Sequence, residues 1–238
     1  NQLPDPVRVA AIYALGSIGT AAVSPLINSL HGHGNADSVR SVRRDHYIHH
    51  GLGENALQLD DASYALSAIG KEAIPSLLDL LESGDEWARM NAAFALGEMD
   101  QQALAAVPAL IQALEDPSHL IVRTAADALG TIGSPQAAKP LGALFQETRP
   151  EWEEEIARTW SPRDQIRVNA ATALARLGPL AAAAEPELIE ALDDQCGQVA
   201  TYAVETLRRI GSPSALDAAF NHLNVERWDP SITSNNGF

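Results

Sequence analysis

The chain has 238 residues, of which 46% are hydrophobic and only 5% are aromatic. Its formal net charge is −15, from 16 basic and 31 acidic residues, which disfavours nucleic acid and anionic membranes as partners because both repel an acidic surface. The sequence lacks the run of about 18 consecutive apolar residues that a membrane-spanning helix needs.

The chain opens with NQLPDPVRV, which contains neither an initiator methionine nor a signal-like apolar block. We therefore expect a fragment of a longer chain or a processed product. The lone Cys196 excludes a disulfide framework and fits a reducing compartment, which favours the cytoplasm.

One phrase, Ala-Leu-x-x-(Ile/Leu/Met)-Gly, recurs along the whole chain. Four clear copies begin at Ala14, Ala65, Ala128 and Ala173, and two degenerate copies begin at Ala95 and Thr206. The central leucines are Leu15, Leu66, Leu96, Leu129, Leu174 and Leu207. Most of them recur with a period of about 30 residues, which predicts an array of stacked repeats. The two wider gaps, after Leu15 and after Leu129, predict two insertions.

Each repeat predicts two helices joined by a short turn. The first helix is rich in alanine, and its closing glycine favours the left-handed conformation of a helix C-cap. The second helix opens near a proline in three repeats, at Pro75, Pro108 and Pro186, where a missing N–H is tolerated. The apolar face of such a hairpin can be covered only by a neighbouring hairpin, so stacking follows.

These residues resemble the short HEAT-like repeat of the phycobilisome-lyase type. The best matches are Asp5-Pro6-Val7-Arg8, Asp164-Gln165-Ile166-Arg167 and Ala106-Val107-Pro108-Ala109-Leu110. The resemblance covers residues 5–224. It implies an all-α fold, an α-solenoid (superhelix) of about six HEAT-like helical hairpins, with the second helices lining its concave side.

We expect one solenoid domain over residues 1–238. Its predicted repeats are 5–30, 55–82, 85–115, 117–146, 164–192 and 195–224, with insertions at 31–54 and 146–163 and a C-terminal tail at 225–238. Both insertions fall between repeats and therefore on the same edge of the array. Lengthened loops on one edge often carry function, although neutral drift at a tolerant site explains them equally well.

The resemblance also indicates which side chains face the concave groove. They are Asn28, Asp79, Gln112, Ala143 and Glu190, and one turn later His31, Glu82, Glu115, Gln146 and Asp193. Five of these ten residues are carboxylates and none is Lys or Arg. A partner with a basic surface is the natural complement, and the alternative is the solvated face of an acidic protein.

The second insertion predicts a short amphipathic helix, because Trp152, Ile156 and Trp160 share one stripe. Its tryptophans either anchor a partner or dock the insertion onto the adjacent repeat. Three acid–base pairs at helical spacing are interpreted as ion pairs on helix surfaces: Asp5 with Arg8, Asp85 with Arg89, and Asp164 with Arg167.

Histidines gather in the first insertion, where His46, His49 and His50 are candidate metal ligands if the stretch is helical. No second ligand pair with a recognised spacing follows, so we predict a surface cluster and no metal or other cofactor. Nucleophile motifs, phosphate-binding loops and dinucleotide fingerprints are absent from the sequence, so no catalytic residue is predicted.

These observations favour a non-catalytic protein–protein interaction scaffold with an acidic concave groove. Its partner is expected to be another protein or a neighbouring domain of the same chain. The repeat type suggests an alternative, a bilin lyase/isomerase-like enzyme or enzyme subunit, and an accessory domain of a larger multidomain enzyme is a further one. The propionates of an open-chain tetrapyrrole would require Arg or Lys in the groove, which the predicted groove lacks.

Overall fold

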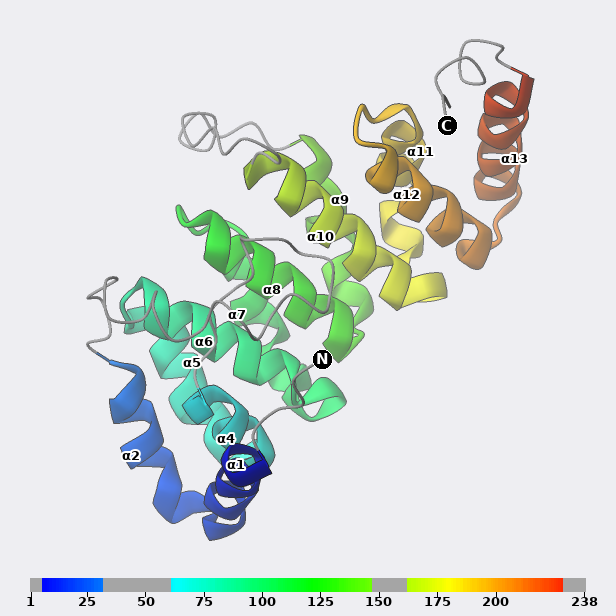
Figure 1. Ribbon diagram of the computed structural model, residues 1–238. Coiled ribbons are helices and arrows are strands. Elements are labelled where there is room, and N and C mark those ends of the chain that lie inside the picture. The colour runs from blue at the N-terminus through cyan, green and yellow to red at the C-terminus, as the bar shows by residue number, and fades with distance from the viewer. Residues whose placement is uncertain (1–5, 32–60, 147–161, 229–238) are drawn as a thin grey trace. The chain divides into compact units, whose positions relative to one another are not determined.

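The computed structural model describes residues 6–31, 61–146 and 162–228, and the regular elements in these ranges are all helical. The chain forms two compact units, residues 1–132 and 133–238, which we describe one at a time. Within each unit, successive helices pair and stack (Figure 1), which confirms the predicted all-α solenoid. No helix in the described ranges combines the length and hydropathy needed to span a membrane.

Unit 1 contains two layers of helices. Its elements are α1 (Pro6–Ile18), α2 (Thr20–Leu30), α4 (Asp61–Ile69), η3 (Lys71–Ala73), α5 (Ile74–Ser83), α6 (Glu86–Gly97), η4 (Asp100–Ala106), α7 (Val107–Ala113) and α8 (His119–Ile132). The first helices α1, α4, α6 and α8 each contact the next in one layer, and the second helices α2, α5 and α7 do so in the other (Figure 1).

Unit 2 repeats this arrangement. Its elements are η5 (Pro135–Ala137), α9 (Ala138–Ala143), η6 (Leu144–Gln146), α10 (Pro162–Leu177), η8 (Gly178–Ala184), α11 (Glu185–Glu190), η9 (Ala191–Asp193), α12 (Gly197–Ile210) and α13 (Pro213–Trp228). The first helices α10 and α12 contact each other, and the second helices α9, α11 and α13 follow one another. The described helices follow the order of the predicted repeats, whereas one array over residues 1–238 stays a prediction.

The turns after the first helices have the predicted left-handed backbone. The repeat glycines with positive φ are Gly19, Gly70, Gly133, Gly178 and Gly211, between 56° and 84°. Asp100 takes the glycine's place in the degenerate third copy and also has a positive φ, of 50°. The turn therefore requires a positive φ even where the residue is not glycine. Proline lies in the first turn of α5, α7 and α11, as expected.

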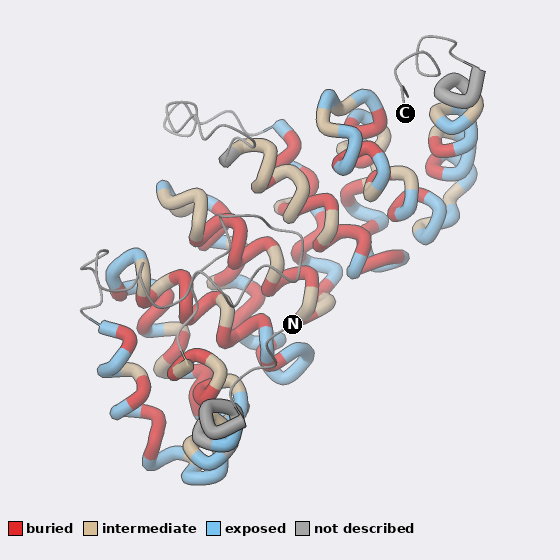
Figure 2. The backbone as a smooth tube through the Cα atoms, in the orientation of Figure 1, coloured by how far each residue is buried: buried red, intermediate tan, exposed pale blue. Residues whose placement is uncertain are grey.

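Buried residues recur along the described helices (Figure 2), and most repeat leucines are among them. Five of them, Leu66, Leu96, Leu129, Leu174 and Leu207, are completely buried. The repeat pattern predicts that Leu15, like the other repeat leucines, is nearly fully buried between hairpins. This prediction is wrong, because Leu15 is only partly buried. Helix α1 contacts α4 and α2, and its Ile18 is 58% exposed.

Consecutive first helices approach each other closely through small residues. A Cβ added to Gly16 would lie 2.8 Å from Cβ of Ala68 in α4. At the same repeat position in α6, a Cβ on Gly97 would lie 2.9 Å from Cα and Cβ of Ala128 in α8. Glycine is required at these contacts because real Cβ atoms are not found so close to a neighbouring atom.

Replacing a repeat leucine should destabilise unit 1. We expect Leu96→Ala or Leu129→Ala to lower the free energy of unfolding by about 2–5 kcal/mol, because each leaves a cavity between hairpins. Leu104→Ala is the control, since this leucine is 51% exposed, and should change stability by about 0.5 kcal/mol or less. Urea titrations followed by circular dichroism would measure all three. If the free energy of unfolding fell by less than about 1 kcal/mol in Leu96→Ala and Leu129→Ala, these leucines would not be the core residues between hairpins.

Candidate functional site

The ten residues predicted to face the groove all lie on the exposed side of the second helices or just beyond their ends. We call them the second-helix face: Asn28, His31, Asp79, Glu82, Gln112 and Glu115 in unit 1, and Ala143, Gln146, Glu190 and Asp193 in unit 2. Every one of them is exposed. Their exposure follows from the burial of the leucines beside them in the same helices, such as Leu77, Leu80 and Leu110.

In unit 1 the second-helix face is acidic, and no described residue neutralises its carboxylates. Helices α2, α5 and α7 contain no Lys or Arg. The side chains of Asp79, Glu82 and Glu115 are exposed and form no hydrogen bond or ion pair with any residue of the described ranges. Because α5 contacts both α2 and α7, this part of the face crosses three adjacent helices. Its exposed carboxylates can attract cations.

In unit 2 the second-helix face is less uniformly acidic. Glu190 accepts a hydrogen bond from Nε2 of Gln146, at 3.0 Å, which ties α11 to the segment after α9. Asp193 is exposed in η9, and α9 contributes the exposed Lys139. The predicted carboxylates are therefore present, but one of them is already hydrogen-bonded.

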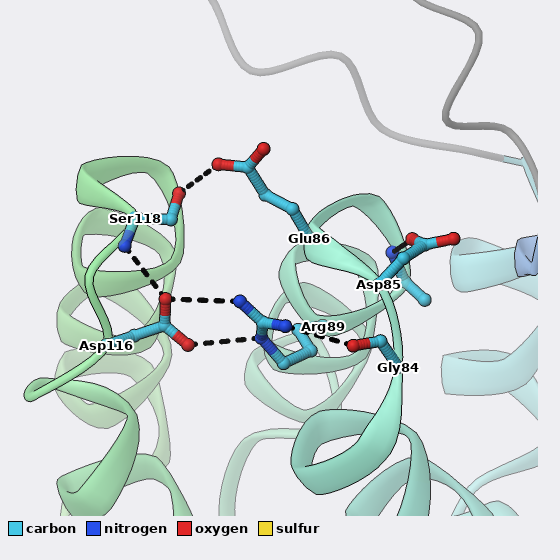
Figure 3. Close-up of polar contacts among 7 residues, drawn as sticks. Gly84, Asp85, Glu86, Arg89, Asp116 and Ser118 are labelled. Carbon is cyan, nitrogen blue, oxygen red and sulfur yellow. Dashed lines mark hydrogen bonds and ion pairs between the residues drawn. The ribbon is translucent and has the colours of Figure 1, made fainter.

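A partly buried contact fixes the turn that follows α7, as Figure 3 shows. Nε of Arg89 donates to Oδ2 of Asp116 at 3.1 Å, and Nη2 donates to Oδ1 at 3.3 Å. Arg89 also donates to the carbonyl of Gly84 at 3.0 Å. Asp116 in turn accepts from the backbone N–H of Ser118, just before α8, at 2.8 Å. One arginine thus connects α6 with the turns on either side of its own repeat.

Unit 2 contains the same contact at the end of α11. Nη1 of Arg167 donates to Oδ2 of Asp194 at 2.8 Å, and Nη2 donates to Oδ1 of Asp164 at 2.6 Å. Asp194 accepts from the backbone N–H of Cys196 at 2.7 Å. The predicted pair of Asp164 with Arg167 is confirmed.

The corresponding prediction for unit 1 assigned the wrong partner. Arg89 binds Asp116 instead of Asp85, because Oδ1 of Asp85 caps the N-terminus of α6 by accepting from Ala88 N–H at 2.9 Å. Sequence analysis missed both long-range aspartates. The available signal was their shared distance in sequence from a repeat arginine, since Asp116 follows Arg89 by the same interval as Asp194 follows Arg167. These aspartates hold in place the neighbouring residues Glu115 and Asp193 of the second-helix face.

A further cation is buried in the core of unit 1. Arg123 in α8 is only 2% exposed, at the repeat position that Met90 occupies in α6. Burial lowers the pKa of Arg123 to about 10, and the nearby charge of Asp127, one turn further along the helix, acts in the opposite direction. Arg123 is therefore a structural cation and is not available on the surface of unit 1.

Some predicted site residues lie outside the described ranges. They are Trp152 and Trp160 of the second insertion and His46, His49 and His50 of the first. In the part of the chain that the structure describes, no group of three or more His, Cys, Asp or Glu side chains is placed to hold a metal ion. His31, the first residue of the first insertion, is described and is exposed just beyond α2.

Comparison with protein families gives two matches. The family profile described as HEAT repeats matches residues 74–160 and 150–230. The profile described as the PBS lyase HEAT-like repeat matches residues 7–32. No curated protein matches the chain.

The solved structures that are similar to this chain include the following three. A chain of the complex of CpcE and CpcF of phycocyanin lyase from Nostoc sp. PCC7120 is 25% identical, with a TM-score of 0.48; the alignment covers 65% of this chain and 61% of that one. An engineered protein is 22% identical, with a TM-score of 0.50 and coverage of 73% and 78%. A designed armadillo repeat protein in complex with the peptide (KR)4 is 16% identical, with a TM-score of 0.52 and coverage of 89% and 95%. The similarity to the engineered protein and to the designed armadillo repeat protein indicates only a shared fold.

Two adjacent aspartates should behave differently when replaced. Asp194→Ala removes the acceptor of Arg167 and of the Cys196 N–H, so it should lower the free energy of unfolding by about 1.5–3 kcal/mol. Asp193→Ala removes only an exposed carboxylate and should change it by about 0.5 kcal/mol or less. Thermal or urea unfolding of both variants would test this difference. Equal losses would show that the Arg167 contact does not stabilise unit 2.

Proposed function

Because this chain belongs to the HEAT-repeat family, whose stacked helices present an extended surface, we propose that it is a protein-binding scaffold. Its second-helix face would bind a basic segment of another protein or of a neighbouring domain of the same chain. The proposal rests on one observation: the carboxylates of this face in unit 1 are exposed and lack both a cation and a hydrogen-bond donor among the described residues.

The charge of the whole chain supports the same kind of partner. With a net charge of −15, the chain would repel a polyanion such as nucleic acid at long range and attract a cationic segment. The carboxylates of unit 1 add a local attraction, because Asp79 and Glu82 lie one turn apart on α5 and Glu115 follows the adjacent α7. A cationic partner would therefore associate faster at low ionic strength.

Trp152 and Trp160 are two further candidate contacts for a partner. Aromatic side chains contribute most to the slow dissociation of a complex, whereas exposed charges contribute mainly to fast association. The two tryptophans lie in the insertion between the fourth and fifth repeats, outside the described residues. We propose that they act as aromatic anchors that slow the dissociation of a bound partner.

The peptide (KR)4 is a suitable probe of the proposal, because every side chain in it is cationic and a repeat protein of similar fold has been solved with it. We would compare the wild type with the triple variant Asp79→Asn, Glu82→Gln and Glu115→Gln. An exposed ion pair contributes about 0.2–1 kcal/mol, so losing three should raise the Kd about tenfold at low salt. The difference should shrink as salt is added.

A second triple variant separates the face from the net charge. Glu72→Gln, Glu98→Gln and Asp100→Asn also neutralise one aspartate and two glutamates that are exposed in unit 1, but away from the second-helix face. On our proposal this control should retain most of the affinity for (KR)4. Equal weakening in both triple variants would mean that only the net charge matters, and no change in either would move the interface elsewhere.

A second candidate function is that of a bilin lyase/isomerase-like enzyme or enzyme subunit. It is favoured by the match of residues 7–32 to the PBS lyase HEAT-like repeat. The second-helix face argues against it, since tetrapyrrole propionates require cations and α2, α5 and α7 contain none.

Titration of the protein with an open-chain tetrapyrrole, followed by absorption spectroscopy, distinguishes the two candidate functions. As a scaffold, the protein should cause no saturable change in the pigment spectrum. Serum albumin would serve as the control for non-specific uptake of the pigment. A saturable spectral shift with about one pigment per chain would favour the lyase-like function.

A further inference from the structure

The last described helix carries an apolar stripe that no other described residue covers. Leu216, Phe220 and Leu223 of α13 are 44%, 66% and 47% exposed. Their spacing of four and three residues places them on one side of the helix. The adjoining side packs into unit 2 through Ala215 and Ala219, which are buried where α13 contacts α11 and α12. We call these three exposed residues the α13 stripe.

The α13 stripe departs from the repeat pattern that the preceding second helix follows. When α11 and α13 are aligned on their opening prolines, the position of the buried Leu188 in α11 is occupied by Ala215 in α13. Phe220 occupies the position of Asp193, so an aromatic ring takes the place of a carboxylate of the second-helix face. Leu216 occupies the position of Ile189. Ile189 is partly buried in α11, which α13 contacts, whereas Leu216 is left exposed.

This comparison indicates what could cover the stripe. Since a second helix covers the apolar position of the second helix before it, the natural cover for Leu216 is another helix lying alongside α13. A complete further hairpin would fit poorly, because it would also have to pack on α12. In α12 the repeat leucine Leu207 is followed by the exposed Arg208. In α1 and α6 the same position is Gly16 or Gly97, which leaves room for the next first helix to approach. The long arginine side chain of α12 leaves less room.

Charge distinguishes the α13 stripe from the rest of the acidic chain. Between residues 213 and 224 the only Asp, Glu, Lys or Arg is Asp217. A basic partner would be attracted to the carboxylates of the second-helix face instead. Two copies of a chain with a net charge of −15 repel each other over most of their surface, but they could approach here with little local repulsion.

We propose that the α13 stripe is a self-association surface, on which α13 of a second copy packs in antiparallel orientation. A two-fold axis near Phe220 would bring Leu216 of one copy next to Leu223 of the other, because these leucines flank Phe220 on either side. Such a contact uses the same patch on both copies, as a two-fold symmetric dimer requires. This inference is independent of what the second-helix face binds.

Molar mass measured by light scattering over a series of protein concentrations tests the proposal. The wild-type mass should rise from that of one chain to that of two. Phe220→Asp places a charge at the centre of the contact and should keep the chain monomeric. Leu104→Asp is the matched control, because Leu104 is 51% exposed on unit 1, and it should dimerise like the wild type. Circular dichroism of each variant would confirm that the fold is retained.

Disulfide cross-linking locates the contact. With Cys196 replaced by serine, Phe220→Cys should form a covalent dimer under mild oxidation, and Leu104→Cys should not. A wild type that remains monomeric at every concentration would overturn the proposal, whether residues 229–238 or another protein covers the stripe. So would a dimer that survives Phe220→Asp, or one in which Phe220→Cys cross-links no better than Leu104→Cys.

Discussion

The close approach of consecutive first helices is the constraint on which the rest of the structure depends. At Gly16 and Gly97 the next first helix comes so near that a Cβ would collide with it. This approach lets the completely buried leucines, such as Leu96 and Leu129, fill the space between hairpins without leaving cavities. Because these first helices are held against one another, the second helices that pair with them have fixed directions, and so does the side that each exposes to solvent.

Stacking also explains why neighbouring acidic residues serve different purposes. Asp116 and Asp194 are drawn inward by Arg89 and Arg167, and each holds the turn that leads into the next first helix. The residue just before each of these aspartates, Glu115 or Asp193, is left exposed. Each arginine contact therefore uses one aspartate, Asp116 or Asp194, to fix the turn. The carboxylate before it stays exposed on the second-helix face. In an acidic protein, the position of a carboxylate relative to this contact decides whether it stabilises the fold or is free to bind.

The two surfaces that we propose differ in their physical chemistry and should respond to different conditions. Attraction between the exposed carboxylates of unit 1 and a cation acts over about 10 Å and weakens with salt. Burial of the α13 stripe acts only on contact and depends mainly on the apolar area removed from water. If two chains associate through their α13 stripes, the dimer has two acidic faces, one from each chain. A partner with several basic segments could then bind both faces at once, with increased avidity.

The sequence by itself determined the helical hairpins, their order, the left-handed turns and the exposed positions of the second helices, because all of these follow from local periodicity and from residues with restricted backbone conformations. Only the tertiary structure decided the partner of Arg89, the partial exposure of Leu15, the hydrogen bond between Gln146 and Glu190, and the uncovered stripe on α13. Each of these depends on which element lies beside another. Helical periodicity shows which side chains share a face, but it does not show what that face meets across a repeat boundary.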